Sequence, residues 1–210
     1  MSLKFIYGRA GSGKSRFCLY DMKSRIEAGQ KNKLVLLVPE QYSLQAEKNL
    51  VHIMENKGTL QADVLSFKRM AYRVFNEVGG ITSSYLNQAS KCMIIYRIIE
   101  KLKDSFEVYS LASKKQGFAN EVCNLITEFK RYNVTPEDLN ILRDNIKSEA
   151  LKKKLTELNA VYTEYERQIK EKYRDADDDL TILAKKLDAS KQFDGAEIWI
   201  DEFSGFTPQE

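Results

Sequence analysis

The stretch GRAGSGKS, Gly8 to Ser15, constrains this chain more than any other feature. A glycine, four further residues and then Gly-Lys-Ser make up the spacing of a phosphate-binding P-loop. The apolar run Leu3 to Tyr7 before it predicts a strand, and the residues from Ser15 onward have helical character. Strand, glycine-rich turn and helix is the context that this motif requires. An ordinary glycine-rich turn is the alternative, but all eight positions fit the motif.

The residue types in this loop match the chemistry of a nucleoside triphosphate. Glycines allow successive N–H groups to curl around an oxyanion, and the start of the following helix adds its positive dipole end. Lys14 would reach the β- and γ-phosphates, and the Ser15 hydroxyl would be a ligand of Mg²⁺. The predicted nucleotide-binding residues are Gly8, Arg9, Ala10, Gly11, Ser12, Gly13, Lys14 and Ser15.

Composition narrows the class of protein. The 210 residues are 43% hydrophobic and 30% charged, as in soluble globular domains, and no apolar run has the length of a membrane span. A net charge of +3 does not by itself argue for nucleic acid. The three cysteines lack metal-ligand spacing and indicate reduced thiols in a cytoplasmic protein. His52 is the single histidine, which disfavours histidine-based catalysis or a His-rich metal site.

Strand and helix signals alternate in the first part of the chain. Apolar runs at Lys33 to Pro39, Ala62 to Phe67 and Ala196 to Asp201 predict strands, and helices are expected at about 14–29 and 41–57. Strands alternating with helices predict an α/β core with a parallel sheet.

Helical signals dominate the middle of the chain. Apolar residues recur at helical spacing in 88–103 and 118–129, and Thr135-Pro136 is typical of a helix start. Ser148 to Tyr173 predicts one long helix packed against its neighbours, with a two-chain coiled coil as the alternative. We therefore expect an all-helical insertion at about 85–190.

A P-loop needs a partner acid at the end of another core strand. The sequence IWIDEF supplies one, because Asp201 follows an apolar run and Glu202 comes directly after it. Asp201 would hold Mg²⁺, and Glu202 could polarise an attacking water. Two exposed acids after an edge strand are the alternative.

Three stretches together with the P-loop carry a family resemblance. They are LVPEQYSLQAEKNL (Leu37 to Leu50), VLSFKRMAYRVF (Val64 to Phe75) and IDEFSGFTPQE (Ile200 to Glu210). The order of motifs resembles superfamily 1 helicases. More narrowly, these stretches resemble the N-terminal region of the AddB (RexB) family, the B subunit of the bacterial AddAB helicase–nuclease.

This resemblance implies a RecA-like, ATP- and Mg²⁺-binding domain similar to helicase domain 1A, at 1–84 and 191–210, interrupted by a 1B-like helical insertion at 85–190. It implies an ATP-dependent helicase and exonuclease acting in recombinational repair of double-strand breaks, with DNA and an AddA-type subunit as partners. Gln41, Ser66 and Phe67 become candidate DNA contacts. An iron–sulfur cluster would belong to a C-terminal nuclease domain, so we interpret the chain as an N-terminal fragment.

The sequence also departs from the pattern of active motors. The strand expected at Leu3 leaves no room for the glutamine segment that reads adenine, and Ser204 stands where superfamily 1 helicases usually have a glutamine. The resemblance therefore predicts nucleotide binding more firmly than turnover. We expect weak binding and negligible hydrolysis from residues 1–210 alone.

Several positions have a structural alternative. Ser66 and Phe67 could be a strand end with a core-packed ring, and Gln41 a helix start. The basic residues Lys68, Arg69, Arg73 and Lys91 could contact phosphates or simply lie on solvated helix faces. The acidic run Asp175 to Asp179 could suggest a metal site, but its position favours a capped helix start.

Two other functions compete with the helicase–nuclease interpretation. A nucleotide-gated scaffold would bind DNA or a partner subunit without catalysis. A small-molecule or nucleotide kinase would need an arginine-bearing lid and a pocket beyond the Asp201 strand, where this sequence reaches Glu210.

Overall fold

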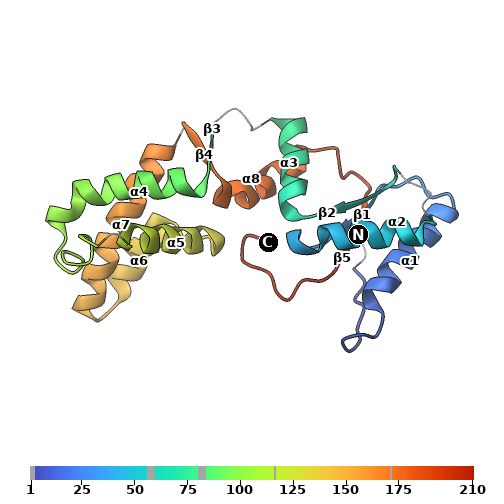
Figure 1. Ribbon diagram of the computed structural model, residues 1–210, viewed down its shortest axis with the longest axis horizontal. Coiled ribbons are helices and arrows are strands. Elements are labelled where there is room, and N and C mark those ends of the chain that lie inside the picture. The colour runs from blue at the N-terminus through green and yellow to red at the C-terminus, as the bar shows by residue number, and fades with distance from the viewer. Residues whose placement is uncertain (1–2, 56–59, 80–83, 116, 171) are drawn as a thin grey trace. The chain divides into compact units, whose positions relative to one another are not determined.

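A computed structural model describes residues 3–55, 60–79, 84–115, 117–170 and 172–210 (Figure 1). Within these ranges the chain forms two compact units. The first, here called the sheet unit, comprises Met1–Val78 and Lys186–Phe206. The second, the helical unit, comprises Gly79–Lys185 and Thr207–Glu210. The protein is thus an α/β protein made mostly of helices.

The sheet unit is built on three parallel strands, which confirms three of the predicted strands. These are β1 (Leu34–Leu37), β2 (Ala62–Leu65) and β5 (Glu197–Ile200), in the order β2-β1-β5. Leu36 of β1 lies beside Val64 on one side and Trp199 on the other. All four residues of β1 are buried, as expected of a parallel strand covered on both faces.

Helices cover this sheet. They are α1 (Lys14–Glu27), η1 (Glu40–Tyr42), α2 (Ser43–Ile53), α3 (Phe67–Val78) and η4 (Leu187–Ala189). One face of α1 and one of α2 pack on alternate residues of β1 and β2, so Met22 and Leu50 share a core with Leu36. The helix α3 follows β2 directly and buries Val74 and Phe75.

The strand predicted at Leu3 to Tyr7 is wrong. In the described part of the chain these residues form no strand, and the side chains of Leu3 and Tyr7 are 81% and 85% exposed. A short apolar segment becomes a strand only where a neighbour supplies its ladder of hydrogen bonds. The strand β5 pairs with β1, and its Ile198 and Ile200 remain about half exposed.

The helical unit confirms the helices predicted between 88 and 173. They are α4 (Gln88–Leu102), η2 (Lys103–Ser105), α5 (Phe118–Arg131), α6 (Pro136–Asn145), α7 (Glu149–Ile169) and α8 (Asp179–Lys186). The long helix α7 packs against α4 and α6 within the same chain. Thr135 caps α6 through a capping box with Asp138, as predicted. No helix in the described ranges has the length and apolar character needed to cross a membrane.

The expectation of an all-helical insertion misses a short parallel ladder. The strands β3 (Ser84–Leu86) and β4 (Tyr173–Asp175) pair with each other in this unit. Three-residue strands carry too few alternating positions to be visible in a sequence pattern.

The acidic run starts a helix and holds no metal group. Asp175 caps η3 (Ala176–Asp178) by accepting a hydrogen bond from the Asp177 N–H, and Asp179 begins α8. Among the described residues, no cluster of His, Cys, Asp or Glu could hold a metal ion. The helix-start interpretation is therefore confirmed.

Candidate functional site

Backbone geometry shapes the loop Gly8 to Ser15. Gly13 precedes α1 with φ +88°, a left-handed conformation that side-chain-bearing residues rarely adopt. A Cβ atom on Gly8 would lie 2.3 Å from the Ser12 hydroxyl oxygen, so this position also requires glycine. The Phe17 N–H donates to the Gly13 carbonyl at 2.8 Å, closing the first turn of α1. The unpaired N–H groups of the helix start consequently belong to the loop itself.

The side chain of Lys14 bends back over this loop. Its Nζ donates to the carbonyl oxygens of Gly8 and Arg9, each at 3.0 Å. The ammonium group therefore lies above the concave side of the loop, next to the start of α1. Positive charge and a helix N-terminus coincide here, which is the electrostatic environment that favours an anion.

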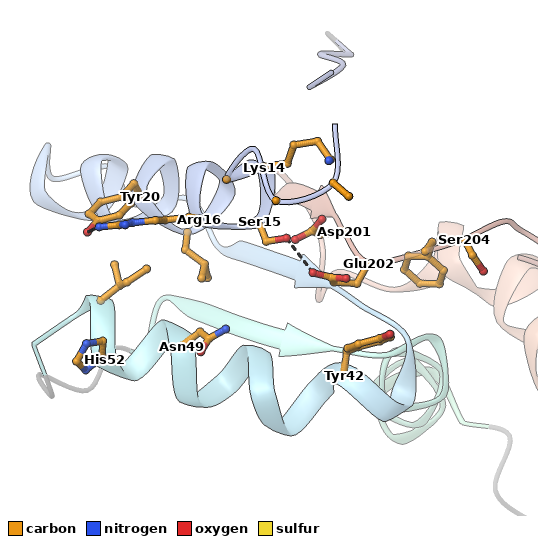
Figure 2. A pocket seen from close by; sticks show the side chains of 16 residues that line it. Lys14, Ser15, Arg16, Tyr20, Tyr42, Asn49, His52, Asp201, Glu202 and Ser204 are labelled. Carbon is orange, nitrogen blue, oxygen red and sulfur yellow. Dashed lines mark hydrogen bonds between the residues drawn. The ribbon is translucent and has the colours of Figure 1, made fainter. Parts of the chain in front are cut away.

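The two predicted acids lie beside the loop, at the carboxyl end of β5. The Asp201 N–H donates to the Leu37 carbonyl at 3.0 Å, which extends the pairing of β5 with β1. Glu202 follows with φ +64°, and its Oε1 accepts a hydrogen bond from the Ser15 hydroxyl at 2.9 Å. Figure 2 shows Ser15, Asp201 and Glu202 turned towards one another. The sequence predicted this grouping, but not that Glu202 would be the acid bonded to Ser15.

The conformation of Glu202 carries a cost. A left-handed backbone costs a residue with a Cβ atom about 1–2 kcal/mol. Such outliers persist where the surrounding structure holds them in place. Here the hydrogen bond from Ser15 on one side and the fixed end of β5 on the other restrain it.

These residues line one cavity of about 1060 Å³, called the P-loop cavity below. It lies entirely in the sheet unit and continues from the loop along α1 and α2 (Figure 2). Its volume is at the upper end of small-molecule sites, which span roughly 300–1,000 Å³. The lining residues are Ala10, Gly11, Gly13, Lys14, Ser15, Arg16, Leu19, Tyr20, Tyr42, Asn49, His52, Ile53, Asp201, Glu202, Phe203 and Ser204.

Neighbouring groups fix the walls of the site. The Trp199 indole N–H donates to Asp21 of α1 at 3.1 Å, which ties β5 to α1 behind the loop. Burial raises the pKa of the Cys18 thiol to about 11, and the charges of Asp201 and Asp21 act in the same direction. Cys18 is thus an unreactive core residue and takes no part in chemistry at the site.

The three candidate DNA contacts differ in their surroundings. Gln41 is exposed in η1. Ser66 is 2% exposed, and its hydroxyl donates to Glu40, which favours the structural interpretation for this residue. Phe67 is half-buried and contacts Phe203 edge-on, with ring centroids 5.6 Å apart.

Three of the four basic residues proposed as phosphate contacts have acidic partners. Arg69 pairs with Glu47, and Arg73 forms two hydrogen bonds with Asp63. Burial acts to raise the pKa of Asp63, but hydrogen bonds from Arg73 and Lys33 outweigh it and hold the pKa below its usual value. Lys91 is 2% exposed and pairs with Asp175 and Asp177, so neither a phosphate contact nor a solvated face describes it.

Sequence reasoning missed residues on two sides of the site. Phe203 stacks on the exposed Phe206 at 4.9 Å, extending the contact with Phe67 into a three-ring cluster. Tyr20 and Asn49 also went unnoticed, although they line the P-loop cavity. The spacing of Tyr20, six residues after Lys14, was a visible signal, because it places the ring on the same helix about 9 Å further along the axis.

Known proteins match the whole chain. Residues 5–210 match the family model described as "ADDB, N-terminal". A protein of Acetivibrio thermocellus is 56% identical over 211 aligned residues, and one of Clostridium botulinum strain Hall is 55% identical over 210. A protein of Thermoanaerobacter sp. strain X514 is 48% identical over 210 residues. Each match covers 100% of this chain and 18% of the relative, and each relative is named as the B subunit of an ATP-dependent helicase/deoxyribonuclease.

Proposed function

We propose a function that starts from one established point: the chain belongs to the AddB N-terminal family. It spans about a fifth of the length of the curated relatives it matches. From this membership and the site, we infer that it is the nucleotide-binding, helicase-like portion of the B subunit of an ATP-dependent helicase–nuclease. The observation that carries the proposal is the Ser15–Glu202 hydrogen bond, because it joins the phosphate-binding loop to the predicted acids.

The proposed fold is a RecA-like domain with an insertion. The RecA-like part corresponds to residues 1–84 and 191–210 and the 1B-like insertion to 85–190. Support comes from the parallel order β2-β1-β5 and from the loop-to-helix turn that ends at Lys14. Ligand sites of open parallel sheets lie at the carboxyl ends of the strands, where Asp201 is found.

In this proposal the loop binds the phosphates of ATP through its N–H groups and Lys14. Mg²⁺ prefers hard oxygen ligands, and the Ser15 hydroxyl and the Asp201 carboxylate supply two of them. When bound, the ion would neutralise charge on the phosphates. Glu202 is the residue that would orient a water molecule, and a change of partner from Ser15 to water would free its carboxylate for that role.

The wider assignment extends from the names of the relatives. We propose that the complete protein acts with an AddA-type subunit on DNA in the cytoplasm, in recombinational repair of double-strand breaks. Within this chain, Gln41 and the ring of Phe67 remain the proposed contacts to single-stranded DNA. Aromatic rings provide stacking surfaces for bases, and the exposed Phe206 extends that surface. The iron–sulfur cluster is proposed only for a nuclease domain outside this sequence.

Calorimetric titration of Mg-ATP into the 210-residue chain tests the proposal. We expect weak saturable binding that Lys14→Ala abolishes and that Lys153→Ala, on the other unit, leaves unchanged. We also expect turnover well below about 1 per second, a scale typical of active enzymes. Absence of binding at millimolar nucleotide would contradict the proposed site. A Lys14-dependent rate at or above that scale would instead show that the chain is itself an ATPase, and would sink the expectation of binding without turnover.

A further inference from the structure

The P-loop cavity extends beyond the space that phosphates need. Past Lys14 and Ser15 it continues between α1 and α2, where Arg16 and Tyr20 face Asn49 and His52 (Figure 2). Leu19 and Ile53 also line it and give it an apolar part. An apolar cavity with a few placed polar groups is the usual form of a small-molecule site.

We propose that this extension binds a purine base, stacked on Tyr20 and hydrogen-bonded to Asn49. The proposal rests on the function proposed above, because the phosphates of the same nucleotide would lie on the loop. Helix geometry supports the arrangement: Tyr20 lies about 9 Å along the α1 axis from Lys14. A separation of this order is that between the γ-phosphate and the base of an extended nucleoside triphosphate.

The ring of Tyr20 is held in position and still accessible. The Arg16 guanidinium lies over it, 5.2 Å from the ring centroid, and also donates to the Tyr20 hydroxyl at 3.1 Å. The side chain nevertheless stays 44% exposed. A ring fixed by a guanidinium on one side offers its remaining surface for stacking at little entropic cost.

Asn49 presents a donor to the cavity. Its Oδ1 accepts a hydrogen bond from Gln45 on the same helix at 2.9 Å, and this bond orients the amide. The Nδ2 group, with two hydrogens, is thereby left to donate. Purines carry the acceptor N7, which pyrimidines lack, and they offer a larger surface for stacking. Both contacts therefore favour a purine.

Calorimetry with a set of magnesium complexes tests this proposal on the 210-residue chain. The ligands are ATP, GTP, CTP and inorganic tripolyphosphate, which has the phosphates without a base. We expect the purine nucleotides to bind about tenfold more tightly than tripolyphosphate, and CTP to lie between them. Tyr20→Ala should remove most of the advantage of ATP and change tripolyphosphate affinity less than about twofold, whereas Tyr20→Phe should retain it.

Asn49→Ala is expected to weaken ATP by about fivefold, the loss of one hydrogen bond. Gln45→Ala is its matched control, because it removes the same Gln45–Asn49 bond without removing a lining residue, and it should have a smaller effect. Tyr72→Ala controls for the loss of an exposed tyrosine on α3. Thermal melts of each variant establish that it is folded.

The outcomes separate this inference from the function on which it rests. Equal affinity for ATP and tripolyphosphate would overturn the base site while leaving the phosphate site intact. An equal loss of both ligands in Tyr20→Ala would do the same, since it would assign the residue a structural role. Binding of none of the four ligands would overturn both proposals together.

Discussion

Lysine has opposite roles in the two units. In the sheet unit, Lys14 is only half-buried, and its ammonium group contacts backbone carbonyls of its own loop. In the helical unit, Lys91 and Lys130 are 2% and 4% exposed and are surrounded by carboxylates. Lys130 contacts Asp175, Asp178 and Glu166 at 2.7–3.2 Å.

The difference separates a lysine available to a ligand from lysines committed to the fold. Burial acts to lower the pKa of Lys130, but the nearby carboxylates outweigh it and raise the pKa above its usual value. Burial likewise raises the pKa of Asp178 to about 6. Charges in this cluster are costly to bury and costly to leave without a partner. Lys14, by contrast, bonds to carbonyl oxygens, and these bonds can be exchanged for a phosphate at little electrostatic cost.

The largest effect should follow the loss of a buried lysine. Lys91→Met leaves the carboxylates of Asp175 and Asp177 with less compensation in the core of the helical unit. Breaking one partner of a buried pair typically costs about 3–5 kcal/mol. Chemical denaturation followed by circular dichroism would measure the loss in the free energy of unfolding.

An exposed pair in the same unit provides the matched control. Lys153 pairs with Glu107 and is itself more than half exposed. Lys153→Met should change the free energy of unfolding by less than about 1 kcal/mol. Similar losses in the two variants would mean that burial does not distinguish these lysines, and the comparison would fail.

A buried acid offers the next largest effect. Glu157 accepts hydrogen bonds from the backbone N–H groups of Glu107, Val108 and Tyr109, at 2.8–2.9 Å. Glu157→Ala leaves those donors unsatisfied and should destabilise the helical unit by about 1–3 kcal/mol. Glu157→Gln, which keeps one carbonyl oxygen, should lose less. Equal stability of the alanine variant and the parent would show that water replaces the carboxylate without cost.

Patterns that repeat along the chain predicted the fold well. The strand β1, the long helix α7 and the capping box at Thr135 all follow from local sequence, because each depends on residues close to one another. The loop motif and the acid pair after β5 were likewise visible, since their spacing is fixed by the turn or strand that carries them.

Contacts between distant segments could not be predicted in the same way. The Lys91 side chain meets residues 84 and 86 positions away, and no local pattern indicates which helix face will bury a charge. The base-stacking candidate Tyr20 depends on α2 packing beside α1. The expected strand Leu3 to Tyr7 failed for the related reason that a strand needs a partner.

A smaller effect is expected at the α6 cap. The Thr135 hydroxyl accepts the Asp138 N–H at 3.2 Å, and Asp138 bonds back to the Thr135 N–H at 2.8 Å. Thr135→Ala should therefore destabilise the helical unit by about 1 kcal/mol. Thr135→Ser keeps the hydroxyl and should be close to neutral. A loss in Thr135→Ser as large as in Thr135→Ala would assign the effect to the threonine methyl group instead of the cap.

The smallest effect on stability is expected at Lys14, where the functional consequence is proposed to be largest. Lys14→Ala removes two hydrogen bonds to carbonyls that water can reach, so the free energy of unfolding should change by no more than about 0.5 kcal/mol. The same variant is expected to lose Mg-ATP binding. Denaturation and titration of one preparation would measure both quantities. A loss of several kcal/mol would place Lys14 with Lys91 as a lysine that holds the fold, and the contrast between the two units would no longer identify a binding residue.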